Sequence, residues 1–356
     1  MCGNPSFQGR VVLCAFGTGG HLFPALSVFS KLKKEHDPIL LLDARGAVYC
    51  QHLADCEKRE ISGGRSLASL RAFLQNMRLL YRCWRKEPPA AVIGFGGCAT
   101  LAPLLLARLL GIPTLIHEQN AVMGRANRVL SLFVQRVLLS FPETRRSLRV
   151  NKRRFTGVPI RPEFLGDTPP PLKKRGDLRL CVLGGSQGAR VFFSVIPRAL
   201  VLLPETLRKR LFVVQQVQEA DLPFVEAFYK IHAIRCELFC FSDKPEALVK
   251  DAHLVVCRAG ASSLAELAAL GRPVLMIPYP YATDNHQAEN ARFYTEHRAG
   301  WCLLEEDFSP ASCAAFLAEH LADLSGLENA GRAMRNLAKI DAAEIVASEI
   351  AALRRS

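Results

Sequence analysis

The sequence predicts an α/β protein built from two similar Rossmann-like domains, and three observations lead to this fold class. Short apolar runs alternate with segments of helical length and periodicity along the chain, which is typical of parallel strands covered by helices. Each half opens with an apolar run and a paired-glycine turn, at Gly19 and at Gly184, and a second strand-to-glycine turn follows at Gly94 and at Gly260. A length of 356 residues also favours two domains over one.

The first half begins with a βαβ unit that carries a glycine-rich first turn. Its strand, turn, helix and second strand are expected at 11–16, 17–20, 23–34 and 39–43. The turn lacks the third glycine of a dinucleotide-binding fingerprint, and Pro24 follows closely, so a nicotinamide cofactor is disfavoured. His21 stands at the mouth of the turn, where it is either a core or capping histidine or a general base beside a phosphate-type loop.

Residues 67–86 predict an amphipathic helix with an unusual charge pattern. Its apolar side chains follow helical spacing and share one face, and arginines seven residues apart border that face. No acidic residue occurs between Ile61 and Lys86. An apolar face edged only by arginine is typical of an anionic membrane interface, whereas a helix packed on the sheet with solvated arginines is the alternative. The apolar face comprises Leu67, Leu70, Leu74, Met77, Tyr81 and Trp84, and the arginines are Arg71, Arg78 and Arg85.

A polar tetrapeptide, His-Glu-Gln-Asn at 117–120, follows the strand expected at 113–116. Ligands of open α/β sheets bind outside the carboxyl ends of the strands, so we expect this tetrapeptide in a site rather than in the core. A cluster of six Lys or Arg residues at 145–154 adds a second basic patch to the same half. Other elements expected here are strands at 91–93 and 137–139 and a helix at 100–110.

Prolines mark the passage between the two halves. Pro159 and Pro162 are followed by three consecutive prolines at 169–171, which predicts an interdomain linker. Arg161, at its start, is placed to face a cleft. The expected domains are residues 1–162, residues 163–340, and a C-terminal helix at 341–356 that returns to the first domain.

The stretch at 257–266 in the second half is typical of an anion site. An apolar strand leads into a small-residue turn and then a helix start, so free N–H groups and the helix dipole would face a phosphate. Gly260 and Ala261 allow close approach of a ligand, and Ser262 and Ser263 are good N-cap residues. Glu266 could then reach a ribose hydroxyl. A simply capped helix is the alternative, with this glutamate favouring the dipole.

Asn, His and Gln at 285–287 precede a helix expected at 288–296. Their side chains suit sugar hydroxyls, and a helix N-cap formed by Asp284 or Asn285 is the alternative. Strands in this half are expected at 178–183, 211–215, 237–241, 253–256 and 274–277, with a helix start at 245–249.

Net charge, cysteine spacing and hydropathy limit the kinds of molecule that this protein is expected to bind and where it is expected to be found. The net charge of +13 implies an anionic partner, which could be nucleic acid, a membrane surface or a phosphorylated substrate, but no RNA-binding aromatic motif or zinc finger occurs. None of the 12 Cys forms a C-x-x-C pair, so we expect reduced cysteines and no metal site. No apolar run has the length of a transmembrane helix and no signal peptide is evident, so we expect a cytosolic protein.

Taken together, the motifs resemble the MurG family of glycosyltransferases, which add N-acetylglucosamine to the lipid-linked muramyl-pentapeptide precursor of peptidoglycan. The ordered set covers both halves of the chain. The matching segments are residues 17–25, 94–97, 117–121, 157–161, 184–190 and 257–261. Cys98 departs from the aromatic residue usual in the family, and Met123-Gly124-Arg125 and the segment at 285–287 also vary.

This resemblance implies a GT-B fold, with two Rossmann-like domains facing each other across a cleft. It implies inverting transfer from UDP-N-acetylglucosamine to the C4 hydroxyl of undecaprenyl-diphospho-N-acetylmuramyl-pentapeptide (lipid I), giving lipid II, without a cofactor or an obligatory metal. The uracil would lie near Phe241 and Ser242, and His286 could join Gln287 at the sugar. The implied donor contacts are Thr18, Gly19, Gly20, Asn120, Arg161, Ser186, Ser242, Gly260, Ala261, Ser262, Ser263, Leu264, Ala265, Glu266 and Gln287.

In this family the acceptor is reached through the first domain at the cytoplasmic face of the membrane, which agrees with the membrane interpretation of 67–86. Proteins of cell-wall synthesis or division are expected partners, and nucleic acid is not. For the general base, His21 is the first candidate and Glu118 the second. Alternatives are a UDP-N-acetylglucosamine 2-epimerase, another glycolipid transferase, and a UDP-sugar-binding protein without turnover.

Overall fold

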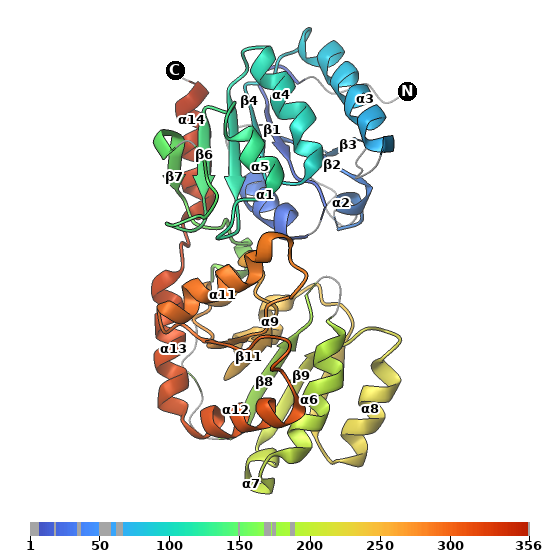
Figure 1. The fold of residues 1–356 in the computed structure, drawn as a ribbon, viewed down its shortest axis with the longest axis vertical. Coiled ribbons are helices and arrows are strands. Elements are labelled where there is room, and N and C mark those ends of the chain that lie inside the picture. The colour runs from blue at the N-terminus through green and yellow to red at the C-terminus, as the bar shows by residue number, and fades with distance from the viewer. Residues whose placement is uncertain are drawn as a thin grey trace. The chain divides into compact units, whose positions relative to one another are not determined.

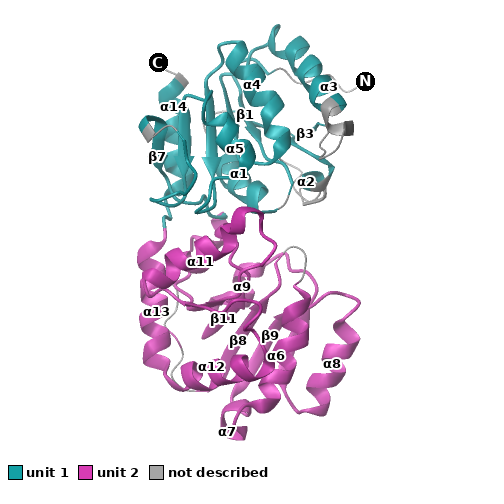
Figure 2. Cartoon of the chain, in the orientation of Figure 1, with its two compact units in different colours: residues 1–161, 339–356 teal, residues 162–338 magenta. Residues whose placement is uncertain are grey.

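A computed structural model describes residues 7–17, 19–33, 37–49, 58–61, 67–148, 150–166, 172, 176–185 and 189–354. The chain divides into two compact units, shown in two colours in Figure 2. The N-terminal unit comprises residues 1–161 and 339–356, and the C-terminal unit comprises residues 162–338.

A seven-stranded sheet, in the order β3-β2-β1-β4-β5-β6-β7, forms the centre of the N-terminal unit. All of its strand pairs are parallel. Because helices cover both faces, the inner strands are continuous apolar runs rather than alternating ones. The strands are β1 (Val11–Cys14), β2 (Ile39–Leu42), β3 (Lys58–Glu60), β4 (Ala91–Gly94), β5 (Thr114–Glu118), β6 (Arg136–Leu139) and β7 (Arg153–Phe155).

The helices of this unit form two layers (Figure 1). One core joins α1 and α14 to the sheet through side chains such as Val11 and Leu13, and the other joins α3, α4 and α5 to it through Val12 and Cys14. The chain's last helix therefore packs against its first. The helices are α1 (Gly19–Leu32), α2 (Ala44–Tyr49), α3 (Leu67–Trp84), α4 (Leu101–Leu109), α5 (Arg125–Leu130) and α14 (Ala342–Arg354), with short 3₁₀ turns at η1 (Cys98–Thr100) and η2 (Val150–Lys152).

The burial of α3 divides the apolar face expected from its sequence. Trp84 is only 1% exposed and its ring meets Phe7 edge-on at 6.0 Å, so it belongs to the core. This corrects the expectation that Trp84 lies on a membrane-facing surface; an apolar helix face alone does not distinguish a membrane interface from a core. Leu74 and Tyr81 are exposed, as is Leu79. The side chains of Leu67 and Leu70 lie outside the described part of the chain.

The C-terminal unit repeats this architecture with a six-stranded parallel sheet, in the order β10-β9-β8-β11-β12-β13. Its strands are β8 (Leu178–Leu183), β9 (Leu211–Gln216), β10 (Arg235–Phe239), β11 (Leu254–Cys257), β12 (Val274–Met276) and β13 (Trp301–Cys302). Its helices are α6 (Arg190–Leu202), α7 (Glu205–Arg208), α8 (Leu222–Ile231), α9 (Pro245–Lys250), α10 (Ala261–Ala269), α11 (His286–Glu296), α12 (Pro310–Ala322) and α13 (Leu324–Leu337), with 3₁₀ turns at η3 (Pro162–Phe164) and η4 (Thr283–Asn285).

Both sheets have the strand order of a doubly wound fold. In each unit the first strand is central, the second and third strands lie on one side of it, and the fourth and later strands lie on the other. The order of winding therefore reverses between β1 and β4 and between β8 and β11, which is where ligands bind in such folds. The predicted fold class of two Rossmann-like domains is confirmed. Among the helices that the structure describes, none has the length and apolar character needed to cross a bilayer.

Candidate active site

The residues expected to act in chemistry lie in two groups, one at the carboxyl edge of each sheet. In the N-terminal unit they follow β1, β4 and β5, and in the C-terminal unit they follow β8, β10, β11 and β12. Thr18 and Ser186, both expected to contact a donor, lie outside the described residues.

The glycine-rich turn after β1 is held by a buried carboxylate on the neighbouring strand. Asp43 Oδ1 accepts hydrogen bonds from the backbone N–H of Gly17 at 3.3 Å and of Gly46 at 3.0 Å. Asp43 therefore caps α2 and fixes the turn at the same time. Helix α1 begins inside the turn, at Gly19, so its first N–H groups lie beside the turn as in an anion site. The sequence analysis missed Asp43, although an Asp ending a strand before a helix is a signal for a cap.

His21 lies in the first turn of α1 with a defined tautomer. Its Nδ1 is 2.8 Å from the carbonyl oxygen of Phe16. A carbonyl can only accept, so Nδ1 carries the hydrogen and Nε2 holds the lone pair. The ring is half-buried and lies against Gly96, where an added Cβ would be only 2.9 Å from Nε2. The absence of a side chain at position 96 thus makes room for the histidine whose Nε2 can accept a proton.

The tetrapeptide at the end of β5, residues 117–120, is mostly buried, which corrects the expectation that it would not be core. His117 is 0% exposed, and Glu118 and Gln119 are each 2% exposed; of the four, only Asn120 is partly exposed. Burial of polar side chains is tolerated when they satisfy one another, and here they form a hydrogen-bonded network. The sequence pattern could not distinguish a buried network from a solvent-facing site because both need polar residues.

Both carboxylate oxygens of Glu118 are occupied by donors. Oε1 accepts from the backbone N–H of Asn120 at 3.1 Å and from its side-chain amide at 3.2 Å. Oε2 accepts from the N–H of Gly124 and the side-chain amide of Asn127, each at 2.9 Å. Glu118 therefore organises the loop that presents Asn120. The buried Asn127 was missed by sequence analysis, since an Asn inside a short helix gives no signal of its own.

Arg161, the last residue of the N-terminal unit before the chain leaves it, is held by an aromatic ring. Its guanidinium carbon lies 4.5 Å from the ring centroid of Phe23, on α1. Such cation–π packing retains the charge while restraining the side chain. The three residues before it, 158–160, are buried. Arg161 is partly exposed, and its guanidinium is restrained by the Phe23 ring.

In the C-terminal unit, α10 begins directly after the small-residue turn that follows β11. Its N-cap is Gly260, with an extended backbone (φ −73°, ψ 130°) and no side-chain capping bond. The sequence analysis expected Ser262 and Ser263 to be the N-cap; instead they lie in the first turn of the helix, because the helix starts three residues earlier than expected. Ser262 is 9% and Glu266 is 7% exposed. A helix N-terminus without a side-chain cap is suited to an anion.

Two amides brace the loops around this helix start. The buried Asn290, on α11, donates from its amide to the carbonyl of Ala259 at 3.0 Å. Gln287 Oε1 accepts from the backbone N–H of Tyr279 at 2.9 Å. Just before α11 the backbone is left-handed at Asp284 (φ 55°) and Asn285 (φ 54°), a conformation that costs free energy and is concentrated at functional sites. The side-chain oxygen of Gln287 is engaged within the protein.

The loops after β8 and β10 are tied together by Gln216, which the sequence analysis missed. Its Oε1 accepts from the N–H of Gly184 at 3.1 Å, and its amide donates to the carbonyl of Cys240 at 3.3 Å. Next to this tie, Ser242 Oγ accepts from the N–H of Lys244 at 3.1 Å and so leads into α9. The ring of Phe241 is 70% exposed. An exposed aromatic ring beside the sheet edge is available to stack on a planar base.

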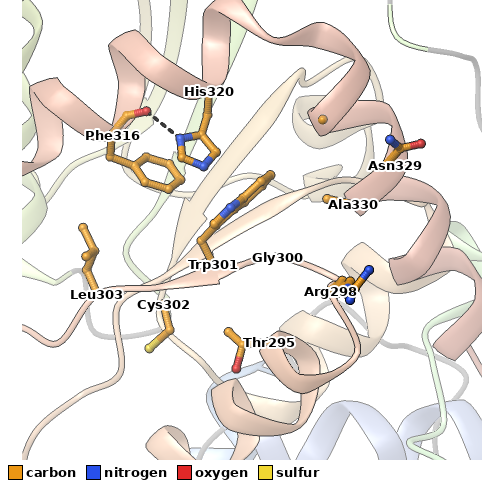
Figure 3. A pocket seen from close by; sticks show the side chains of 11 residues that line it. Thr295, Arg298, Gly300, Trp301, Cys302, Leu303, Phe316, His320, Asn329 and Ala330 are labelled. Carbon is orange, nitrogen blue, oxygen red and sulfur yellow. Dashed lines mark hydrogen bonds between the residues drawn. The ribbon is translucent and has the colours of Figure 1, made fainter.

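A separate cavity of about 570 Å³ lies at the edge strand β13, and none of the expected donor contacts lines it (Figure 3). Its aromatic wall is a self-packed cluster: the Phe316 and His320 rings stack at 4.0 Å, and Trp301 meets His320 edge-on at 4.5 Å. These contacts fasten α12 to β13. In the part of the chain that the structure describes, no group of three or more His, Cys, Asp or Glu residues is placed to hold a metal ion.

Comparison with known families matches both units. Residues 11–139 match the glycosyltransferase family 28 N-terminal domain, and residues 179–345 match the glycosyltransferase family 28 C-terminal domain. Among curated proteins, a UDP-N-acetylglucosamine--N-acetylmuramyl-(pentapeptide) pyrophosphoryl-undecaprenol N-acetylglucosamine transferase of Rhodospirillum rubrum is 40% identical, covering 96% of this chain and 92% of that protein. One of the same name from Paramagnetospirillum magneticum is also 40% identical, covering 96% of each.

Solved structures agree with this comparison. MurG of Acinetobacter baumannii superposes with a TM-score of 0.81 at 27% identity, covering 97% of this chain and 99% of that one. A UDP-GlcNAc 2-epimerase from Neisseria meningitidis, bound to UDP-GlcNAc, has a TM-score of 0.70 at 12% identity, covering 96% and 99%. At that identity the second likeness concerns the fold alone.

Proposed function

This chain belongs to glycosyltransferase family 28, and we propose that its two Rossmann-like units carry out the reaction for which its relatives are named. It is a UDP-N-acetylglucosamine-dependent glycosyltransferase of GT-B architecture that transfers N-acetylglucosamine to lipid-linked N-acetylmuramyl-pentapeptide, converting lipid I to lipid II. The observation that carries this conclusion is 40% identity over 96% of the chain to transferases of that name. The roles of individual residues below are our proposal.

We assign donor binding chiefly to the carboxyl edge of the C-terminal sheet. The N–H groups at the start of α10, from Gly260 to Ala265, would receive the diphosphate, since the helix dipole and the missing side-chain cap favour negative charge there. The carboxylate of Glu266, one turn further on, would accept from ribose hydroxyls. Phe241 and Ser242 would face the uracil, and the Gln287 amide, held by Tyr279, would meet the sugar hydroxyls.

The general base in this proposal is His21. The C4 hydroxyl oxygen of the muramyl residue attacks the anomeric carbon as the bond from that carbon to the UDP oxygen breaks, and the hydroxyl proton passes to Nε2. Nε2 is the nitrogen with the lone pair, because Nδ1 donates to Phe16. Glu118 is the weaker candidate, because four donors already occupy its two oxygens. Attack opposite the leaving group inverts the anomeric configuration.

The leaving UDP gains negative charge, and fixed dipoles and cations must stabilise it. We assign this to the start of α10, and to Arg161 and Asn120 of the N-terminal unit, with the α1 turn at Thr18, Gly19 and Gly20. Arg161 suits the role because the Phe23 ring restrains its guanidinium, which keeps its positive charge, and the residue is partly exposed.

We propose that the exposed face of α3 docks on the bilayer that holds the acceptor, at the cytoplasmic side. Leu74, Leu79 and Tyr81 are 58%, 55% and 41% exposed, and Arg71 and Arg78 are exposed beside them. Apolar side chains that enter the interface and arginines that meet anionic headgroups would hold the protein peripherally. Compared with the face expected from the sequence, this exposed surface includes Leu79 and excludes the buried Trp84.

The test of this function is incubation of the purified protein with UDP-N-acetylglucosamine and lipid I, each omitted in turn. We expect UDP release and lipid II only when both are present. Consumption of the UDP-sugar without acceptor would instead indicate an epimerase, which shares the fold. Donor binding without turnover would indicate a sensor protein.

A further inference from the structure

The carbonyl group of Gly157 is the meeting point of a buried hydrogen-bond network. It accepts from His117 Nε2 at 3.0 Å, from Thr156 Oγ1 at 3.1 Å and from Ser140 Oγ at 3.4 Å. A carbonyl oxygen has two lone pairs, so two close donors and a third more distant one saturate it. Its position is therefore set by its neighbour Thr156 and by two other segments of the N-terminal unit, those of His117 and Ser140.

Packing against the Cα atom also fixes the position of Gly157. The backbone of Gly157 is left-handed (φ 79°), and an added Cβ would lie 2.4 Å from the Cβ of Lys339, where the chain re-enters this unit. No other residue fits there without displacement of one of the two crossing segments. Gly157 is thus held by hydrogen bonds to its oxygen and by the Lys339 side chain packed against its Cα.

The three residues that separate Gly157 from Arg161 transmit this position. Val158 is 5% and Ile160 is 3% exposed, and Pro159 between them has a fixed φ. Each anchored residue removes freedom from the next, so a displacement at Gly157 moves the start of Arg161. The Phe23 ring restrains the Arg161 guanidinium separately. The guanidinium therefore keeps one position only when the backbone of 157–161 is also in place.

The orientation of His117 is determined by Gln119. The Gln119 amide donates to Nδ1 of His117 at 3.0 Å and to the His117 carbonyl at 3.2 Å. Because Nδ1 accepts, the hydrogen of the neutral ring is on Nε2 and points at Gly157. Full burial lowers the pKa of His117 to about 4, so the ring stays neutral. The same backbone stretch carries Glu118, which orders Asn120.

We propose that His117 is a positioning residue, which fixes the segment 157–161 through the Gly157 carbonyl and so sets the place of Arg161 relative to Asn120. This inference rests on the function proposed for Arg161. This role accounts for a histidine without solvent contact near a site. His117 contacts no substrate, but it holds together two substrate-facing segments that are about forty residues apart in sequence.

Two substitutions separate this role from a general structural one. In His117→Gln the side-chain amide nitrogen takes the approximate place of Nε2 and can still donate to Gly157. In His117→Asn the amide nitrogen takes the place of Nδ1 and cannot reach it. We expect His117→Asn to lower kcat about tenfold, the equivalent of one lost hydrogen bond of about 1.4 kcal/mol, and His117→Gln to restore kcat to within about threefold of wild type. Equal kcat losses in both, or kcat losses that vanish after correction for the folded fraction, would overturn the proposal.

A double-mutant cycle tests whether the effect passes through Arg161. Arg161→Ala should lower kcat, and His117→Asn should lower it no further in that background, because there is no cation left to position. Losses that multiply, or Arg161→Ala with unchanged kcat, would refute the positioning role. Lipid II formation by the wild-type protein in the same assay is the separate test of the proposed function, so failure of one is distinguishable from failure of the other.

Discussion

Substitution of Gly96 by alanine tests the placement of His21 without touching the histidine itself. An alanine Cβ would lie 2.9 Å from both Nε2 and Cδ2 of His21, on a backbone with φ 108°. Real Cβ contacts are not that short, so the ring must shift by at least several tenths of an ångström. The Nδ1 bond to Phe16 then lengthens or the loop moves, and Nε2 leaves its position. A misplacement of this size near the reacting atoms costs on the order of 10² in rate.

Gly111→Ala is the matched control for this substitution. Gly111 is also left-handed, with φ 74°, but an added Cβ there meets nothing within 4 Å. Both variants should therefore lose about 1 kcal/mol of stability from backbone strain, and only Gly96→Ala should lose turnover. The assay is single-turnover transfer to lipid I, with UDP affinity and thermal unfolding measured in parallel. Turnover of Gly96→Ala equal to that of Gly111→Ala would refute the assigned position of the base.

Three further predictions follow from burial, charge and backbone geometry. Burial lowers the pKa of His117 from an ordinary value near 6.5 to about 4, so the neutral ring stabilises the fold above pH 6.5. This contribution to the free energy of unfolding declines by up to about 3 kcal/mol as the pH falls towards 4. The free energy of unfolding, measured at several pH values, should depend less on pH in His117→Gln than in wild type, and an unchanged pH dependence would contradict the lowered pKa. The double variant Leu74→Glu/Tyr81→Glu should bind vesicles rich in anionic lipid at least about tenfold more weakly than wild type. The control Ile231→Glu, at a side chain that is 77% exposed in the C-terminal unit, should bind them as wild type does. Equal binding by wild type, the double variant and the control would count against docking through α3. The backbone of Arg298, just after α11, is left-handed with φ 55°. The variant Arg298→Gly should therefore be up to about 1 kcal/mol more stable than wild type, with unchanged kcat. Because Arg298 lines the cavity at β13, a loss of kcat would instead give that cavity a role in the reaction.

The strand centres could be predicted from sequence because strands covered on both faces are continuous apolar runs. The strand β8 has the bounds that its apolar run predicts. The edge strands β3 and β7 gave no such signal, since Lys58–Glu60 and Arg153–Phe155 are short and charged. Charge on an edge strand opposes pairing with another chain, so the feature that protects these strands also conceals them. Arginines at 153–154 were accordingly interpreted only as part of a basic patch.

Helix starts were the other weak point, for a related reason. Helix α1 begins at Gly19 and α10 at Ala261, each earlier than expected. Glycine has low helix propensity and serine favours caps and turns, and a sequence pattern therefore assigns them to the turn. In the folded protein the helix extends into that turn. The motifs placed strand-to-helix turns at Gly17 and Gly260, where the structure has them, but the partners Asp43, Asn127 and Gln216 could be identified only from their contacts.

The most direct measurement of the mechanism is single-turnover transfer from UDP-N-acetylglucosamine to lipid I by His21→Ala, compared with wild type at saturating donor. General base catalysis contributes about 10²–10⁴, so the rate constant should fall at least about 100-fold while UDP affinity and the unfolding temperature stay near those of wild type. A fall of less than about tenfold in a folded, donor-binding protein would contradict the assignment of His21 as the group that accepts the proton.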